Sequence, residues 1–336
     1  LRTLSALETV GDAVAEGGID PAEGARRIDA ALAAPAPYPA WLATLCFAVT
    51  SAAAARFFGG GVGEIAASAM VGLVVGLLSL LAERLAPLGR VFEAVAAVTS
   101  ALLATLAGRY LGPLSIYIPT LAGIIVLVPG FTLTVAVTEL ATRNLVSGTA
   151  RMAGAAGTFL AIGFGVALGT RLGAALVGDL PAVRPASLPL WTEWIALLLA
   201  PLALTVLLRA PLRDLVWIEI AGVLAFAGAR VGAVMLGAEL GTFVGAFLVA
   251  GASNAYARFF DRPSAIPLVP ALLLLVPGAL GFRSLSSLID RQTVSGIEAA
   301  FRMTLVAISL AMGLLSGQLL VPPRGVTRGE SAPPPA

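Results

Sequence analysis

Two glutamates of this chain stand where a charge is costly. Glu139 lies in an apolar or neutral segment, 132–142, and Glu219 lies between Ile218 and Ile220. A charge at mid-membrane depth costs about 2.5–3.5 kcal/mol on insertion scales, so a glutamate buried there is partly protonated and can cycle with a flow of protons. Both residues are therefore predicted to couple proton movement to transport.

Each glutamate also has a plainer interpretation. Glu139 lies four residues before Arg143, which is the spacing of an ordinary ion pair on a helix surface. Glu219 lies near enough to the end of its apolar run that its side chain can snorkel to a membrane interface. The sequence leaves both alternatives open.

A Pro-Gly pair occurs twice in matching register. Pro129-Gly130 follows Leu127-Val128, and Pro277-Gly278 follows Leu275-Val276, 148 residues later. Proline lacks an amide donor and glycine weakens the helical state, so each pair predicts a break within an apolar helix. The same offset relates two further sets of residues: Ile118-Pro119 with Ile266-Pro267, and Val146-Ser147-Gly148 with Val294-Ser295-Gly296. The chain is therefore predicted to be a duplicated membrane protein with one broken helix per half.

These breaks are the predicted substrate site. A half-helix that starts after Pro129-Gly130 has unpaired amides and a positive dipole end, which suit a carboxylate. Thr132 and Thr134 add hydroxyl groups, and the carbonyl of Val128 is placed to accept an ammonium. Pro277-Gly278 would repeat the arrangement from the opposite side, so the two breaks together suit a zwitterionic amino acid. The alternative is a pair of proline kinks that only shape helix packing.

Two further side chains have a candidate role. Asn254 lies deep in an apolar run, where its amide either binds substrate or bridges two helices, and the bridge ranks first. The single cysteine, Cys46, also lies in an apolar run and is interpreted as a small core residue.

Composition excludes several classes of protein. The chain has 336 residues, is 58% apolar and 12% charged, and has a mean hydropathy of +0.96, which indicates a polytopic helical membrane protein. It has no histidine, so Ser-His catalysis and His-ligated zinc are excluded. It has no lysine, and hence no P-loop. We therefore expect no enzyme activity, no metal, no cofactor and no nucleic-acid partner.

Ten membrane spans are predicted, each near the roughly 20 apolar residues that cross a bilayer. They lie near 40–57, 64–82, 92–110, 116–129, 150–170, 189–208, 214–235, 240–257, 265–277 and 298–320. Residues 1–37 form a short helical lead, with Asp20 as an N-cap, Pro21 at the first helical position and Glu23 completing a capping box. Because the chain starts at Leu1 rather than Met, we expect this lead to be truncated.

The ten spans divide into an exporter-like repeat at 38–178, a second at 179–322 and a disordered tail at 323–336. Five spans per half force the second half to enter the membrane in the opposite sense, which predicts an inverted repeat. Arg26, Arg27 and Arg324 favour cytoplasmic termini. The predicted fold is thus an all-α polytopic membrane protein built from two inverted five-helix repeats, each with a Pro-Gly-broken fourth helix.

These motifs resemble the threonine/serine exporter family of bacterial inner-membrane proteins. In the first half the resemblance rests on segments 128–134 and 145–151 with Glu139, and in the second half on segments 254–258 and 267–278. The lead resembles a shortened form of that family's cytoplasmic segment. Glu139 stands where the family commonly has Asp, and Arg143-Asn144 replaces a usual Gly-Asp.

The resemblance implies export of small amino acids such as threonine and serine across the bacterial inner membrane, driven by proton antiport. Its implied partners are the amino acid, protons and the lipid bilayer, with a homo-oligomer left open. Two alternatives remain. The first is an exporter of small dicarboxylates such as succinate, because in some bacteria the two halves are separate proteins linked to dicarboxylate export. The second is a passive channel or a structural membrane partner.

Overall fold

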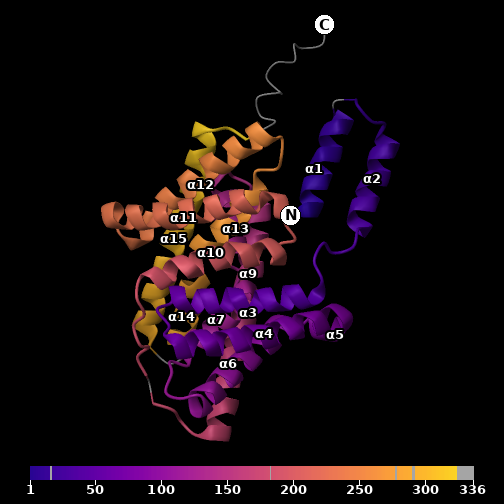
Figure 1. The fold of residues 1–336 in the computed structure, drawn as a ribbon. Coiled ribbons are helices and arrows are strands. Elements are labelled where there is room, and N and C mark those ends of the chain that lie inside the picture. The colour runs from indigo at the N-terminus through magenta and orange to yellow at the C-terminus, as the bar shows by residue number, and fades with distance from the viewer. Residues whose placement is uncertain (16, 182, 277, 290–291, 324–336) are drawn as a thin grey trace.

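The structure is a computed structural model that describes residues 1–323 apart from 16, 182, 277 and 290–291. Across these residues it consists of helices and connecting loops, with no β-strand (Figure 1). Helices suit a bilayer because each satisfies its backbone polar groups internally. The predicted all-α polytopic class is therefore confirmed. The predicted site residue Pro277 and tail residues 324–336 lie outside the described residues.

The lead is a helical hairpin that stands beside the main body of the molecule (Figure 1). It consists of α1 (Arg2–Ala15) and α2 (Pro21–Ala33). The carboxylate of Asp20 accepts the amide of Ala22 at 3.3 Å, which confirms the predicted N-cap. Glu23 bonds to Arg27 and Arg26 instead of completing the capping box, and these two hydrogen bonds lower the pKa of its carboxyl group.

The two halves contain six corresponding helices each, while the short elements α5, η1 and η2 occur in one half only among the described residues. The first half holds α3 (Ala40–Phe57), α4 (Val62–Arg84), α5 (Ala86–Gly89), α6 (Phe92–Tyr110), α7 (Tyr117–Gly123), η1 (Ile125–Leu127), α8 (Gly130–Ala141) and α9 (Leu145–Val177). The second half holds α10 (Trp191–Leu207), η2 (Leu212–Asp214), α11 (Leu215–Leu236), α12 (Ala238–Phe260), α13 (Ala265–Leu275), α14 (Gly278–Ile289) and α15 (Thr293–Leu320).

All ten predicted spans fall on helical segments of the described chain. Eight segments of the described chain are long and apolar enough to cross a bilayer, and the bent pair of α7 with η1 and α8 makes a ninth if it forms one span. The 17-residue α10 is apolar but shorter, so the count of ten stays a prediction. Some predicted boundaries were too short, most clearly the fifth span, because α9 has 33 residues. At about 1.5 Å per residue α9 is roughly 50 Å long, so it exceeds the hydrocarbon core, which is about 30 Å thick.

Both predicted breaks interrupt their helices, but to different degrees. The first helix stops at Gly123, and the axis of α7 makes a 52° angle with the segment Ile125–Ala141. In the second, α13 ends at Leu275 and α14 begins at Gly278. Among the described helix pairs that together have the length and apolarity of a membrane span, only the first bends by more than 40°.

Local backbone geometry repeats with the sequence. The N-cap residues of α9 and α15, Asn144 and Gln292, have φ/ψ of −81°/65° and −88°/65°. Each donates its amide at 2.8 Å to the carbonyl five residues earlier, on Glu139 and Ser287 respectively. Residues 148 positions apart therefore share backbone conformation at this point of the two halves, as well as residue type in the repeated motifs.

A second correspondence lies at the starts of α4 and α11. The preceding helices end at residues with positive φ, Gly59 at 80° and Arg209 at 52°. Five residues beyond each of these positions stands a buried acid, Glu64 or Asp214, with 4% and 0% of its surface exposed. Glu64 accepts two backbone amides, at 2.9 Å each, and thereby ties two loops of the first half together.

The helices that open the two halves lie antiparallel. Arg56, near the end of α3, pairs with Glu193 in the first turn of α10. At the opposite end Tyr38, just before α3, donates its hydroxyl to the carbonyl of Ala210, just after α10. This is the pairing expected of an inverted repeat, while inversion of the halves as a whole stays a prediction.

Candidate functional site

The two Pro-Gly breaks lie against each other. A Cβ added to Gly130 would lie 1.9 Å from Val276 Cγ1 and 3.1 Å from the backbone nitrogen of Gly278. A Cβ added to Gly278 would lie 2.7 Å from Val128 Cγ1. Only glycine permits backbones to approach this closely, so the glycine of each pair is needed for the contact as well as for the break. We call this contact the junction.

Some polar groups of the junction already have partners. The carbonyl of Val128, predicted to accept an ammonium, accepts the amide of Gly130 at 2.8 Å. The hydroxyl of Thr134 is buried and donates to the carbonyl of Gly130 at 3.1 Å. Thr132 lies in the first turn of α8 and is partly buried. The amides of that first turn have no carbonyl within α8 to bond, as at any helix start.

A cavity of about 480 Å³ borders the junction and is lined by both halves. Ile125, Val126 and Phe131 line it beside the first break, and Val276 and Ala279 line it beside the second. Most of its other walls are apolar, and its volume falls within the range of small-molecule sites. We call it the central cavity.

The central cavity has one charged corner, which contains Glu193 and Arg230. A carboxylate oxygen of Glu193 accepts a hydrogen bond from Arg230, and the other lies 3.4 Å from Arg56 Nη2. Arg56 is almost fully buried and also donates to the Thr192 hydroxyl at 2.5 Å and to the Pro189 carbonyl at 3.3 Å. Three charges from α3, α10 and α11 therefore meet at this corner.

Aromatic rings and one hydroxyl complete the lining. The guanidinium of Arg230 lies 4.8 Å from the centre of the Phe226 ring, which also contacts Phe57 and Trp194. The hydroxyl of Thr50 is buried in the cavity wall and has no hydrogen-bond partner within the described structure. A buried hydroxyl without a partner is costly, so Thr50 is suited to bond a polar ligand.

The predicted residue Asn254 bridges two helices outside the central cavity, and a part in substrate binding stays a prediction. Its side chain is 3% exposed and donates to the carbonyl of Val321 at 2.7 Å, so it joins α12 to the end of α15. It is not among the residues that line the central cavity. Of the two roles offered by the sequence, the structure shows the helix bridge, because the end of α15 leaves a carbonyl that needs a donor.

The predicted coupling residue Glu139 lies near the end of α8. It accepts the hydroxyl of Ser147 at 2.7 Å and Nε of Arg151 at 2.9 Å, both from α9. The predicted pair with Arg143 is not formed, because α8 ends at Ala141 and Arg143 has a φ of 65°. Nine residues of helix place Glu139 roughly 14 Å from the break.

The other predicted coupling residue, Glu219, lies on α11. One of its carboxylate oxygens is buried without a hydrogen-bond partner among the described residues. Glu219 does not line the central cavity. Leaving a carboxylate oxygen in this condition costs free energy, and binding a proton relieves the cost.

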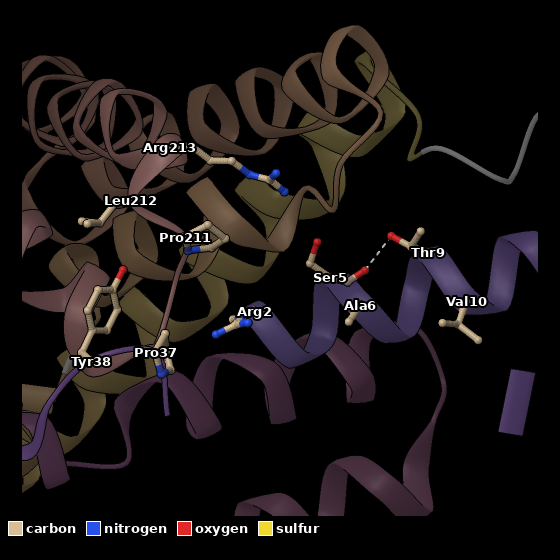
Figure 2. A pocket seen from close by; sticks show the side chains of 10 residues that line it. All are labelled: Arg2, Ser5, Ala6, Thr9, Val10, Pro37, Tyr38, Pro211, Leu212 and Arg213. Atoms are coloured by element: carbon tan, nitrogen blue, oxygen red, sulfur yellow. Dashed lines mark hydrogen bonds between the residues drawn. The ribbon is translucent and has the colours of Figure 1, made fainter. Parts of the chain in front are cut away.

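A larger cleft, of about 660 Å³, lies elsewhere, between the lead and the loop before α11 (Figure 2). Arg2, Ser5 and Thr9 from α1 face Pro211 and Arg213 across it. The backbone amide of Arg2 donates to the carbonyl of Arg209 at 3.0 Å. This cleft touches neither break, so we assign it to docking of the lead and take the central cavity as the candidate substrate site.

Tyr38, on the wall of that cleft, helps to hold the lead in place. Burial raises the pKa of its hydroxyl above the ordinary value, which keeps the group a hydrogen-bond donor to the Ala210 carbonyl.

Sequence reasoning missed the charged corner. Arg56, Glu193 and Arg230 lie in three separate apolar runs, each near a helix end, where a charge is ordinarily interfacial. The one hint in the sequence was that the helices carrying these residues come early in their halves: α3 opens the first half, and α10 and α11 open the second. Only the tertiary packing of α3 against α10 and α11 brings the charges together.

Comparison with known proteins places the chain in a family. A sequence model described as "Putative threonine/serine exporter" matches residues 1–173, and a second, described as "Threonine/Serine exporter, ThrE", matches residues 193–320. Both describe exporters rather than enzymes. No solved structure matches the chain.

The curated relatives include fungal membrane proteins named "Pheromone-regulated membrane protein 10". The one from Candida albicans is 28% identical over 91% of this chain and 30% of its own length. The one from Saccharomyces cerevisiae strain S288c is 26% identical over 90% of this chain and 85% of its own length. The chain thus spans less than a third of the Candida relative. With its two family matches in one polypeptide, this chain belongs to the threonine/serine exporter family.

Proposed function

We propose that this protein is a secondary transporter that exports small amino acids such as threonine and serine across the bacterial inner membrane by proton antiport. The observation that carries the proposal is the central cavity at the junction, because both halves line it and both broken helices reach it. Broken helices that meet at a cavity between repeats are typical of the substrate sites of secondary transporters. The family match supports the substrate class.

The chemistry of the cavity suits a zwitterion. The starts of α8 and α14 have positive dipole ends, which favour an anionic group on the substrate within the cavity. Glu193 and the hydroxyl of Thr50 offer acceptors for an ammonium or a side-chain hydroxyl. The walls outside the charged corner are uncharged and mostly apolar, so they offer no charged partner for an ionic group beyond the ammonium and the carboxylate.

Transport would follow from the paired halves. The antiparallel contact of α3 with α10 supports an inverted repeat, in which one half rocks against the other around a fixed site. With both termini in the cytoplasm, the Tyr38 end of this helix pair faces inward and the Arg56–Glu193 end faces outward.

The proposal is tested by purified protein in liposomes. We expect saturable uptake of labelled L-threonine that a pH gradient accelerates and that unlabelled L-serine competes. Competition by succinate but not by serine would instead show a dicarboxylate exporter. Flux without saturation would show a passive channel.

Proton coupling is expected to depend on the two glutamates. Replacing Glu219 with Gln removes a carboxylate whose buried oxygen lacks a partner, so gradient-driven threonine flux should fall by about tenfold or more while threonine exchange continues. Glu139→Gln should act in the same way if its pair with Arg151 opens during the cycle. Both rates are measured in the same liposomes.

Glu83→Gln is the matched control, because Glu83 is an exposed glutamate at the end of α4 and its substitution should alter neither rate. If gradient-driven threonine flux in Glu219→Gln or Glu139→Gln equals that of wild type, the replaced residue does not couple protons to transport.

A further inference from the structure

The charged corner of the central cavity carries an excess of positive charge. Two guanidinium groups, Arg56 and Arg230, face one carboxylate, Glu193, so the corner has a net charge of +1. Arg56 does not itself line the cavity, and the lining residues other than Glu193 and Arg230 are uncharged. An anionic group that enters the cavity is therefore attracted to this corner, and the low polarity of the walls strengthens the attraction.

The two arginines are held very differently. The Arg56 side chain is 8% exposed and has three partners, on Glu193, Thr192 and Pro189. The Arg230 side chain is 57% exposed and contacts Glu193 and the ring of Phe226. Arg56 is thus held in place beneath Glu193, and the exposed Arg230 is the cation with freedom to move.

Glu193 does not need Arg230 to remain paired. Its second oxygen lies 3.4 Å from Arg56, and that arginine is buried with it. If Arg230 turned to another anion, Glu193 would keep a buried counter-ion, so the exchange would leave no charge alone in the protein. The corner is therefore built so that Arg230 can change partners at low cost.

A movement of Arg230 would change contacts between the two halves. Its guanidinium stacks on Phe226, whose ring lies 5.7 Å from the ring of Phe57 on α3 and 6.2 Å from that of Trp194 on α10. Phe57 and Phe226 both line the central cavity. Phe57 lies at the end of α3 and Trp194 near the start of α10, so this contact with Phe226 of α11 lies at the outward end in the topology proposed above.

We propose that Arg230 binds the carboxylate of the transported amino acid, exchanging its bond to Glu193 for a bond to the substrate, while Arg56 keeps Glu193 neutralised. The proposal rests on the proposed transport function. Guanidinium suits this role because it binds carboxylates in a bidentate, charge-assisted geometry. Release of the Arg230–Glu193 bond on binding then loosens a contact between α10 and α11 at the outward end of the cavity.

The test compares Arg230→Gln, Arg230→Lys and wild type in threonine exchange between liposome compartments, a measurement that needs no pH gradient. We expect the half-saturating threonine concentration to rise by about tenfold or more in Arg230→Gln and to return partway in Arg230→Lys. Arg171→Gln, a change of an exposed arginine on α9, is the matched control and should leave it unchanged.

A second arm uses threoninol, which keeps the ammonium and hydroxyl of threonine but has no carboxylate. It should compete at least about tenfold more weakly than threonine in wild type, and equally weakly in wild type and Arg230→Gln. Threonine saturation in Arg230→Gln that equals wild type, or threoninol that competes as well as threonine, would overturn the role of Arg230. Absence of saturable threonine exchange in wild type would overturn the proposed function itself.

Discussion

Replacing Gly130 with alanine is expected to reduce threonine flux by about tenfold or more. The added Cβ would lie 1.9 Å from Val276 Cγ1, so α8 and the second break must move apart. Overpacking of this kind costs about 1–3 kcal/mol, enough to shift a conformational equilibrium many-fold. The measurement is the initial rate of threonine exchange by equal amounts of protein that elute as a single species.

Two companion variants make this result specific. Gly154→Ala is the matched control, because a Cβ there meets no atom within 4 Å and should leave the rate unchanged. Val276→Ala removes the methyl group that the new Cβ would meet, so Gly130→Ala with Val276→Ala should recover part of the lost rate. If Gly130→Ala transports as wild type does, the close contact of the two breaks is not needed for transport.

Replacing Asp214 with alanine is expected to destabilise the fold more than any other single change considered for this protein. Its side chain is 0% exposed and accepts hydrogen bonds from the Tyr256 hydroxyl at 3.0 Å and from Arg262, with Arg213 3.8 Å away. Asp214→Ala removes two hydrogen bonds to a carboxylate, each worth about 1.5–3 kcal/mol, and leaves the buried Tyr256 hydroxyl without its acceptor, while Arg262 and Arg213 can turn to solvent. The measurement is the midpoint of thermal unfolding in detergent.

Asp179→Ala makes the same chemical change at an exposed acid in the loop between the halves, and it should leave the midpoint unchanged. Asp214→Asn keeps an acceptor for Tyr256 and should fall between Asp214→Ala and wild type. A midpoint for Asp214→Ala equal to that of Asp179→Ala would show that this buried cluster is not what fixes the α10–α11 loop.

The all-helical class and the helix breaks were predictable because each depends on residues that are close together in the sequence. An apolar run of sufficient length must be a helix in lipid, and Pro129-Gly130 cannot sit inside a regular helix whatever surrounds it. The N-cap at Asp20 was readable for the same reason, since its bond to Ala22 spans two residues. Boundaries were harder, because apolar periodicity does not mark where α9 stops.

The partners of charged side chains were not predictable in this way. Glu139 pairs with Arg151 because the chain turns between α8 and α9, whereas helical spacing pointed to Arg143. Arg56 and Glu193 are 137 residues apart and meet only through helix packing. The partner of Asn254 could not be predicted either. Its acceptor is the carbonyl of Val321, and the residues around position 254 do not indicate which distant carbonyl lies nearby.

The most direct test of the central claim is whether threonine protects the central cavity from a water-soluble thiol reagent. The natural Cys46 is replaced by alanine, and Phe131→Cys then places one thiol in the cavity beside the first break. Leu212→Cys, in the cleft of Figure 2, is the matched control. Alkylation of each is followed over time at increasing concentrations of L-threonine.

We expect threonine to slow alkylation at position 131 in a saturable manner, at concentrations that match its half-saturation in exchange, and to leave position 212 unaffected. Equal rates at position 131 with and without threonine, or protection only at position 212, would contradict binding of the amino acid where the two broken helices meet.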